Sequence, residues 1–112
     1  MKILTRVVCG LLENYYDLPA QAKTEKCQQS ADILTRLYNR LSAAMQQLDP
    51  LDRQVIQMLN MPPEAAQKRA TWNGQHPTAA AVCSELGLTE NQLRTRHYRA
   101  LKLMQTAVFV EK

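Results

Sequence analysis

The spacing of apolar residues predicts two helices near the start of the chain. Over residues 2–16, adjacent apolar pairs recur every four positions, which places a broad apolar stripe on one side of a helix. Pro19 ends this helix. After a polar stretch, apolar residues three and four positions apart predict a second, longer helix that ends near Leu48. Residues 1–48 are therefore predicted to form an N-terminal helical pair.

Capping signals mark the start of a third helix. Asp49 is a good N-cap, a proline follows at the first helical position, and a second acid lies near the positive end of the helix dipole. This helix is predicted to run to about Asn60, where two prolines stop it. The connection over residues 60–77 is long for a small helical domain and has room for a short helix at residues 64–70.

A helix, a short glycine turn and a final helix are predicted at the C-terminal end. Thr78 caps a short helix that ends at Leu86, and Gly87 supplies the left-handed residue of the turn. Thr89 caps the last helix, with Gln92 three positions on to complete a capping box. Two helices joined in this way form a helix-turn-helix.

The predicted fold class is all-α: a helical bundle with a C-terminal helix-turn-helix and an N-terminal helical pair. Aromatic residues are only 5% of the 112 residues and glycines only three, a composition that favours helices over strands. The predicted division is an N-terminal helical segment, residues 1–48, and a helix-turn-helix domain, residues 49–112. Two roles stay open for the N-terminal segment. It completes a single core, or it forms a homodimer that presents two recognition helices to half-sites about one DNA turn apart.

The net charge of +4 is concentrated at the C-terminal end. Residues 1–48 carry six basic and four acidic groups, residues 49–90 carry three and five, and residues 91–112 carry five and one. Such an asymmetry is expected of a surface that binds phosphate groups.

The last helix is predicted to have an apolar side and a side rich in groups that bind double-stranded DNA. Leu93, Ala100 and Met104 face inward, together with His97. The other side carries amides, which pair with adenine, and arginines, which pair with guanine or neutralise phosphates. The predicted base readers are Asn91, Gln92 and Arg94, and the predicted phosphate ligands are Arg96, Arg99 and Lys102 with the capping residues Thr78 and Thr89.

Two segments carry a more specific pattern, LDPLDRQVIQML and TAAAVCSELGLTENQLRTRHYRALKLMQ. Together they span residues 48–105 and resemble the fourth conserved region of bacterial sigma factors, a helical domain that reads the promoter −35 element. The resemblance implies RNA polymerase as a second partner, through the flap of its β subunit. It also implies base contacts and backbone contacts at matching positions: Glu90, Asn91, Gln92, Arg94 and Thr95 for bases, and Arg96 and Arg99 for the backbone.

The chain departs from this family in three respects. Glu90 and Asn91 stand where primary sigma factors have arginine and glutamate, so the usual −35 sequence is not implied. The long connection holds Lys68 and Arg69, for which contacts with DNA, polymerase or the core stay open, and Trp72, which is expected to close the core. The N-terminal segment is too short for the sigma region that melts the −10 element. A sigma-like regulator, similar to small phage or mobile-element transcription proteins, is therefore expected.

Other classes have less support in the sequence. There is no nucleophile motif or glycine-rich phosphate loop, and the three cysteines have no metal-ligand spacing with the two histidines. Neither an enzyme nor a cofactor is expected, and the cysteines are predicted to be buried free thiols. No apolar run suits a membrane span or a signal peptide, which predicts a cytoplasmic protein with no membrane partner.

Two alternatives remain at this point. One is a sigma-mimicking interaction module that binds RNA polymerase or another regulator without reading DNA; such a module has no need to keep Arg94, Arg96 and Arg99 free. The other places the chain with response-regulator helix-turn-helix proteins, because LDPLDRQVI also resembles their first helix. In those proteins the helix-turn-helix usually follows that helix more closely.

Overall fold

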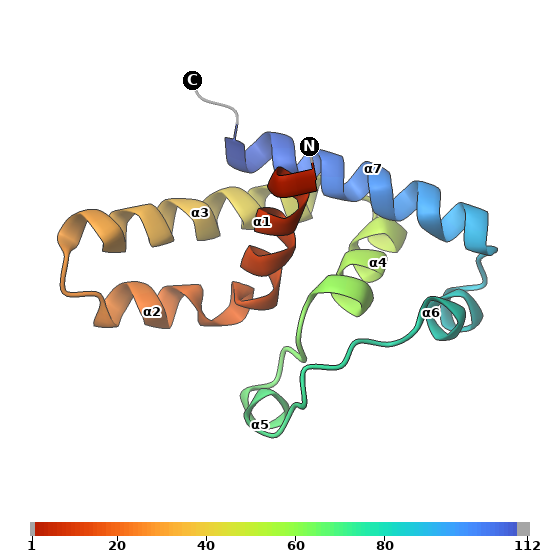
Figure 1. Cartoon of the computed structure of the whole chain (residues 1–112), viewed down its shortest axis with the longest axis horizontal. Coiled ribbons are helices and arrows are strands. Elements are labelled where there is room, and N and C mark those ends of the chain that lie inside the picture. Colours follow the sequence, from red (N-terminus) through yellow and green to blue (C-terminus); the bar gives the residue numbers. More distant parts are fainter. Residues whose placement is uncertain (1, 110–112) are drawn as a thin grey trace.

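Seven α-helices and one 3₁₀ turn form the part of the chain that the structure describes (Figure 1). The computed structural model describes residues 2–109, with side chains from residue 5 onward. The prediction of an all-α chain is confirmed over these residues. The elements are α1 (Lys2–Glu13), the 3₁₀ turn η1 (Tyr15–Asp17), α2 (Leu18–Thr24), α3 (Gln28–Gln47), α4 (Pro50–Asn60), α5 (Ala66–Ala70), α6 (Ala79–Leu86) and α7 (Glu90–Phe109).

The beginning of the chain holds one more helix than the apolar pattern predicted. The helix predicted over residues 2–16 ends at Glu13 and continues as η1, while its first apolar pair, at positions 3 and 4, falls on side chains outside the described set. Pro19 does follow the end of that helix, but it also lies in the first turn of α2. A proline is tolerated there because the first N–H groups of a helix have no intrahelical partner.

The corner between α3 and α4 is fixed by local hydrogen bonds. The Asp49 carboxylate accepts a hydrogen bond of 3.0 Å from the backbone N–H of Asp52, which confirms the predicted N-cap. Arg53 donates to the Met45 carbonyl at 3.0 Å and to the Leu48 carbonyl at 3.1 Å. Carbonyl groups at a helix C-terminus lack intrahelical donors, so Arg53 satisfies the end of α3 while it starts α4.

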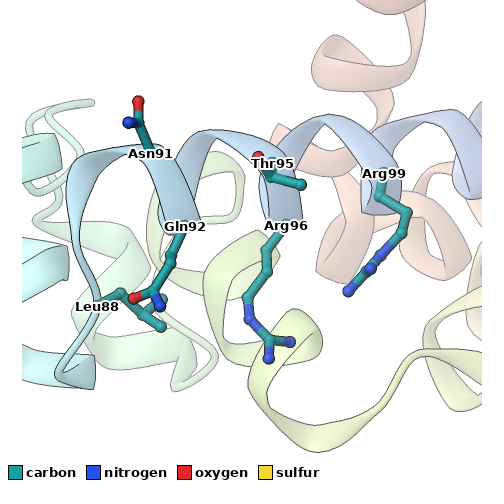
Figure 2. A pocket seen from close by; sticks show the side chains of 6 residues that line it. All are labelled: Leu88, Asn91, Gln92, Thr95, Arg96 and Arg99. Carbon is teal, nitrogen blue, oxygen red and sulfur yellow. The ribbon is translucent and has the colours of Figure 1, made fainter.

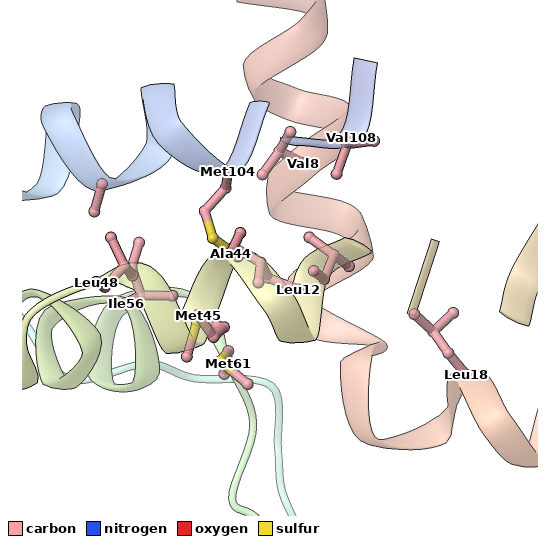
Figure 3. Packing of buried hydrophobic residues seen from close by; sticks show 12 residues of the cluster. Val8, Leu12, Leu18, Ala44, Met45, Leu48, Ile56, Met61, Met104 and Val108 are labelled. Atoms are coloured by element: carbon pink, nitrogen blue, oxygen red, sulfur yellow. The ribbon is translucent and has the colours of Figure 1, made fainter. Parts of the chain in front are cut away.

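The larger hydrophobic cluster combines α1, α2 and α3 with α4 and α7 (Figure 3). Leu12 of α1, Leu41 of α3, Ile56 of α4 and Met104 of α7 are inaccessible to solvent. Residues on both sides of position 48 therefore share one core. Its buried members are Val8, Leu12, Leu18, Leu41, Ala44, Met45, Leu48, Ile56, Met61, Ala100, Met104 and Val108.

A smaller cluster lies at the other end of α7. Val55 of α4, Val82 of α6 and Leu93 of α7 form its buried centre. In Figure 1, α7 crosses the molecule, with α1 and α3 beside its C-terminal half and α4 and α6 beside its N-terminal half. This cluster therefore fixes the N-terminal half of α7 on α4 and α6.

Aromatic residues lie at the edge of the larger cluster and in the long connection. Tyr15 stacks on Tyr38 with ring centroids 4.9 Å apart, and both pack against the cluster. Trp72 was expected to close the core, but it lies outside both clusters. Its indole N–H donates to the Gln75 carbonyl at 3.0 Å, and its ring meets the ring of His76 edge to face. Trp72 thus stabilises the connection itself.

Arg69 ties that connection to the N-terminal helices. Its Nε lies 3.5 Å from the Asp17 carboxylate, and its guanidinium lies 5.3 Å from the centre of the Tyr16 ring. Arg69 therefore contacts η1, where Tyr16 packs against the larger cluster. The neighbouring Lys68 is exposed.

The cysteines and the hydropathy of the helices were also predicted from the sequence. All three cysteines are free, but the prediction that all are buried was wrong: Cys27 is exposed at the N-cap position of α3, while Cys9 and Cys83 are half-buried. Among the helices of residues 2–109, none has the length and hydropathy needed to cross a membrane.

Candidate nucleic-acid interface

The connection between α6 and α7 is a three-residue turn with defined backbone hydrogen bonds. The hydroxyl of Thr78 caps α6 by accepting from the backbone N–H of Ala81 at 3.1 Å. At the other end, Gly87 has φ of 69°, and the N–H of Leu88 donates to the carbonyl of Cys83 at 3.0 Å. The N–H of Gly87 also donates to the Cys83 carbonyl, so this is a left-handed helix C-cap with the 6→1 bond of the Schellman motif.

A reciprocal capping box starts α7. The Thr89 hydroxyl accepts from the backbone N–H of Gln92 at 3.1 Å, and the Gln92 side-chain oxygen accepts from the backbone N–H of Thr89 at 3.0 Å. Both hydrogen bonds were predicted from the sequence, and both satisfy donors that a helix N-terminus leaves unpaired. The Gln92 side-chain oxygen is therefore engaged, whereas its NH₂ group donates to no other described residue.

Loss of this cap is expected to destabilise the fold measurably. Thr89→Ala removes the hydroxyl acceptor and should lower the free energy of unfolding by about 1 kcal/mol, within a range of roughly 0.5 to 2 kcal/mol. Urea titration followed by circular dichroism measures the change. The control is Thr95→Ala, on the same helix and exposed, which is expected to stay within about 0.5 kcal/mol of the wild type. Equal losses in both variants would contradict the role of the cap.

The predicted base readers are all exposed on the first two turns of α7. Arg94 donates a hydrogen bond of 3.3 Å from its Nη1 to the Asn91 side-chain oxygen, which draws these two side chains together. At 100° per residue, Arg94 and Gln92 project from opposite flanks of the helix. The exposed candidates are Glu90, Asn91, Gln92, Arg94 and Thr95.

An open groove runs along one flank of α7 (Figure 2). We call it the α7 groove; it is lined by Leu88, Asn91, Gln92, Thr95, Arg96 and Arg99. Predicted base readers and predicted phosphate ligands therefore meet in one depression. Arg94 and Lys102 lie outside its lining, and so do the capping residues Thr78 and Thr89.

Asp52 holds the two arginines of the α7 groove. Arg96 Nη1 lies 2.8 Å from Asp52 Oδ1, and Arg99 Nη2 lies 3.2 Å from Asp52 Oδ2. Asp52 is only 5% exposed, whereas 61% of the Arg99 side chain and 29% of the Arg96 side chain are accessible. The sequence pattern suggested only that Asp52 interacts with the dipole of α4. Arg96 and Arg99, which were expected to project outward or to lie on the flanks of the helix, each direct one nitrogen to this carboxylate.

Asp49 adds a second acid to the same place. Its Oδ2 lies 3.6 Å from Arg96 Nη1. The backbone N–H of Asp52 and, to a smaller extent, the charges of Arg96 and Arg99 lower the pKa of the Asp49 carboxyl. The hydrogen bond and charge of Asp52 raise the pKa of the Arg96 guanidinium. The two acids and the two arginines thus form one connected network of ion pairs between α7 and the start of α4.

A polar chain of three residues lies behind α7, on the side away from the groove. His97 Nε2 is 2.6 Å from the Asn60 side-chain oxygen, and the Asn60 amide donates to Cys9 Sγ at 3.4 Å. Because the Asn60 oxygen only accepts, His97 Nε2 carries the proton of the neutral ring. Burial lowers the pKa of His97 from its ordinary value of 6.5. His97 was predicted to face inward, and it links α7 to α4 and, through Asn60, to α1.

The lowered pKa of His97 predicts acid sensitivity of the fold. In the unfolded chain the imidazole binds a proton near pH 6.5, whereas the folded protein resists that proton, so stability is lost as the pH falls through this region. The melting temperature is therefore expected to fall between pH 7.5 and pH 5.5, and His97→Gln is expected to flatten that dependence. Thr95→Ala, which lies on the same helix, is exposed and removes no titratable group, serves as the control and should keep it. An unchanged pH profile in His97→Gln would contradict the assignment.

Searches for a metal site among the described residues and for related proteins found nothing. Between residues 2 and 109, no group of three or more His, Cys, Asp or Glu side chains is placed to hold a metal ion. Comparison with protein-family models, with curated proteins and with solved structures gives no match to this chain.

Proposed function

We propose that the chain is a sequence-specific DNA-binding transcription regulator whose helix-turn-helix consists of α6, the Gly87 turn and α7. One observation carries the proposal: the N-terminal half of α7 is anchored on α4 and α6, yet its first two turns expose amide and guanidinium groups. Asn91 and Arg94 are of the types that pair with adenine and guanine in the major groove.

The dimensions of α7 suit this role. Its 20 residues make a helix of about 30 Å, and the major groove of B-DNA is about 12 Å wide, which admits one α-helix. The N-terminal half of α7 enters the groove with Asn91 and Arg94 toward the base edges. Arg96, Arg99 and Lys102 follow along the helix and contact phosphates. RNA polymerase is the proposed second partner, on the resemblance to the sigma domain alone.

One observation favours the alternative, a sigma-mimicking module that binds RNA polymerase or another regulator without reading DNA. Two of the three arginines that DNA binding would use, Arg96 and Arg99, are paired with Asp52. DNA binding remains the better supported function because Arg94 has no acidic partner in the described structure and because 61% of the Arg99 side chain is accessible beside the ion pair.

Affinity selection from a random duplex library tests the proposal. The purified wild-type protein is compared with an Arg94→Ala, Arg96→Ala double variant. An enriched motif that the variant fails to select supports a sequence-reading regulator, and a palindromic motif supports a homodimer. If the wild type enriches no motif, sequence-specific DNA binding is ruled out, and a pull-down of RNA polymerase then tests the interaction module.

A further inference from the structure

The residues that line the α7 groove offer hydrogen-bond donors with few free acceptors, and the exposed carboxylate of Asp49 lies outside the lining, 3.6 Å from Arg96. Gln92 uses its side-chain oxygen in the capping box, so its NH₂ group is the part available to a ligand. The hydroxyl of Thr95 is exposed and makes no hydrogen bond among the described residues. Arg96 and Arg99 carry only donors. With Leu88 and Asn91, these side chains line an open depression of about 330 Å³.

Asp52 orients the arginines without using up their donors. A guanidinium has five N–H groups, and Asp52 engages one nitrogen of Arg96 and one of Arg99. The carboxylate is buried beneath the groove, and both arginines descend from α7 toward α4 (Figure 2). Because the carboxylate holds both side chains in place, less conformational entropy is lost when a ligand binds their remaining N–H groups.

We propose that the α7 groove is a binding site for one phosphodiester of the DNA backbone, with Gln92, Thr95, Arg96 and Arg99 as its ligands and Asp52 as a positioning residue. The inference rests on the proposed function and deepens it. A phosphodiester has only acceptors, which complements a groove that presents donors. Gln92 is then a phosphate ligand rather than a base reader, and base reading belongs to Asn91 and Arg94.

The capping box supplies a selective variant. Gln92→Glu keeps an oxygen that accepts from the Thr89 N–H, so the start of α7 is preserved. It replaces the NH₂ donor with a carboxylate that repels phosphate. Affinity for duplex DNA is expected to fall roughly tenfold or more, by the same factor for the selected duplex and for a scrambled one. The control is Gln105→Glu, which makes the same charge change on α7 outside the groove.

Replacing one phosphate of the duplex at a time with a neutral analogue locates the contact. Methylphosphonate is substituted at each backbone position of the selected duplex in turn. At one position the affinity of the wild type is expected to fall, and the difference in affinity between Gln92→Glu and the wild type is expected to largely disappear. Any smaller loss of affinity that Gln105→Glu shows is expected to persist at that position. Circular dichroism and thermal melting of each variant check that the fold is retained.

The outcomes separate the two proposals. If the wild type binds no duplex, the proposed function fails. If the wild type selects a motif but Gln92→Glu changes the preferred base at one position, Gln92 reads a base and the phosphate site is wrong. The site is equally overturned if the wild type binds duplex and no neutral phosphate relieves the Gln92→Glu defect, which would leave the groove to an acidic protein partner.

Discussion

Leu12→Ala is expected to lower the free energy of unfolding by about 2 to 5 kcal/mol, the usual cost of truncating a fully buried leucine. Leu12 is inaccessible to solvent and belongs to the cluster that also contains Leu41, Ile56 and Met104. Truncation removes apolar contacts and leaves a cavity among three other helices. Because that cluster spans residue 48, the whole described chain is expected to unfold in one transition. Urea unfolding, followed by circular dichroism and by Trp72 fluorescence, measures both quantities.

Two further variants make this expectation specific. Val7 lies on the same helix but is 42% exposed. Val7→Ala is therefore expected to lower the free energy of unfolding by much less than Leu12→Ala does. Met104→Ala, on α7, is expected to lower the free energy of the same unfolding transition by about 2 to 5 kcal/mol. Coincident midpoints from the two probes would support one cooperative unit. A second transition that keeps its wild-type midpoint in Leu12→Ala would instead show that α4 to α7 fold independently.

Helix boundaries could be predicted from the sequence where short-range chemistry determines them. Asp49, Thr78 and Thr89 each cap a helix through a residue three positions away, and Gly87 provides the left-handed turn between two helices. Such signals depend on neighbours in the chain, so one sequence is enough to find them. They correctly predicted the start of α4, both ends of α6 and the start of α7.

No comparable local signal indicated α2. Pro19 can follow one helix or begin the next, and the polar residues after it carry no strong apolar period. What stabilises α2 is the burial of Leu18 against the larger cluster, a tertiary contact. For Trp72 the sequence suggested a core contact, whereas the structure places this residue outside both clusters. A large aromatic residue in a long connection suggested core closure, but its ring meets its own neighbours Gln75 and His76 instead.

The candidate site likewise has one feature that the sequence predicts and one that it does not. Exposure of the first turns of α7 follows from helical periodicity and could be predicted. The pairing of Asp52 with Arg96 and Arg99 could not, because it joins residues 44 and 47 positions apart and depends on how α4 and α7 cross. The sequence predicted different ligands for Arg94 and for the other two arginines, but only the structure shows that Arg94 bonds to Asn91 while Asp52 holds Arg96 and Arg99.

This distinction makes Arg94→Ala the decisive functional variant. A good bidentate contact between a side chain and a base discriminates by about 1 to 3 kcal/mol. Arg94 lies beside Asn91 and outside the α7 groove, so its loss is expected to relax the preference at one base pair while affinity for unrelated duplexes changes little. Competition binding with every single-base change in the selected duplex measures this loss position by position.

Lys102→Ala is the matched control. Lys102 is exposed two turns further along α7, with its Nζ 6.0 Å from the centre of the Tyr98 ring. A lysine that neutralises one phosphate weakens binding to all sequences and reduces the slope of log affinity against log salt by about one. Arg94→Ala is expected to leave that slope nearly unchanged. If both variants instead lose affinity equally for every sequence, Arg94 contacts only the backbone, and sequence reading must come from other residues of α7.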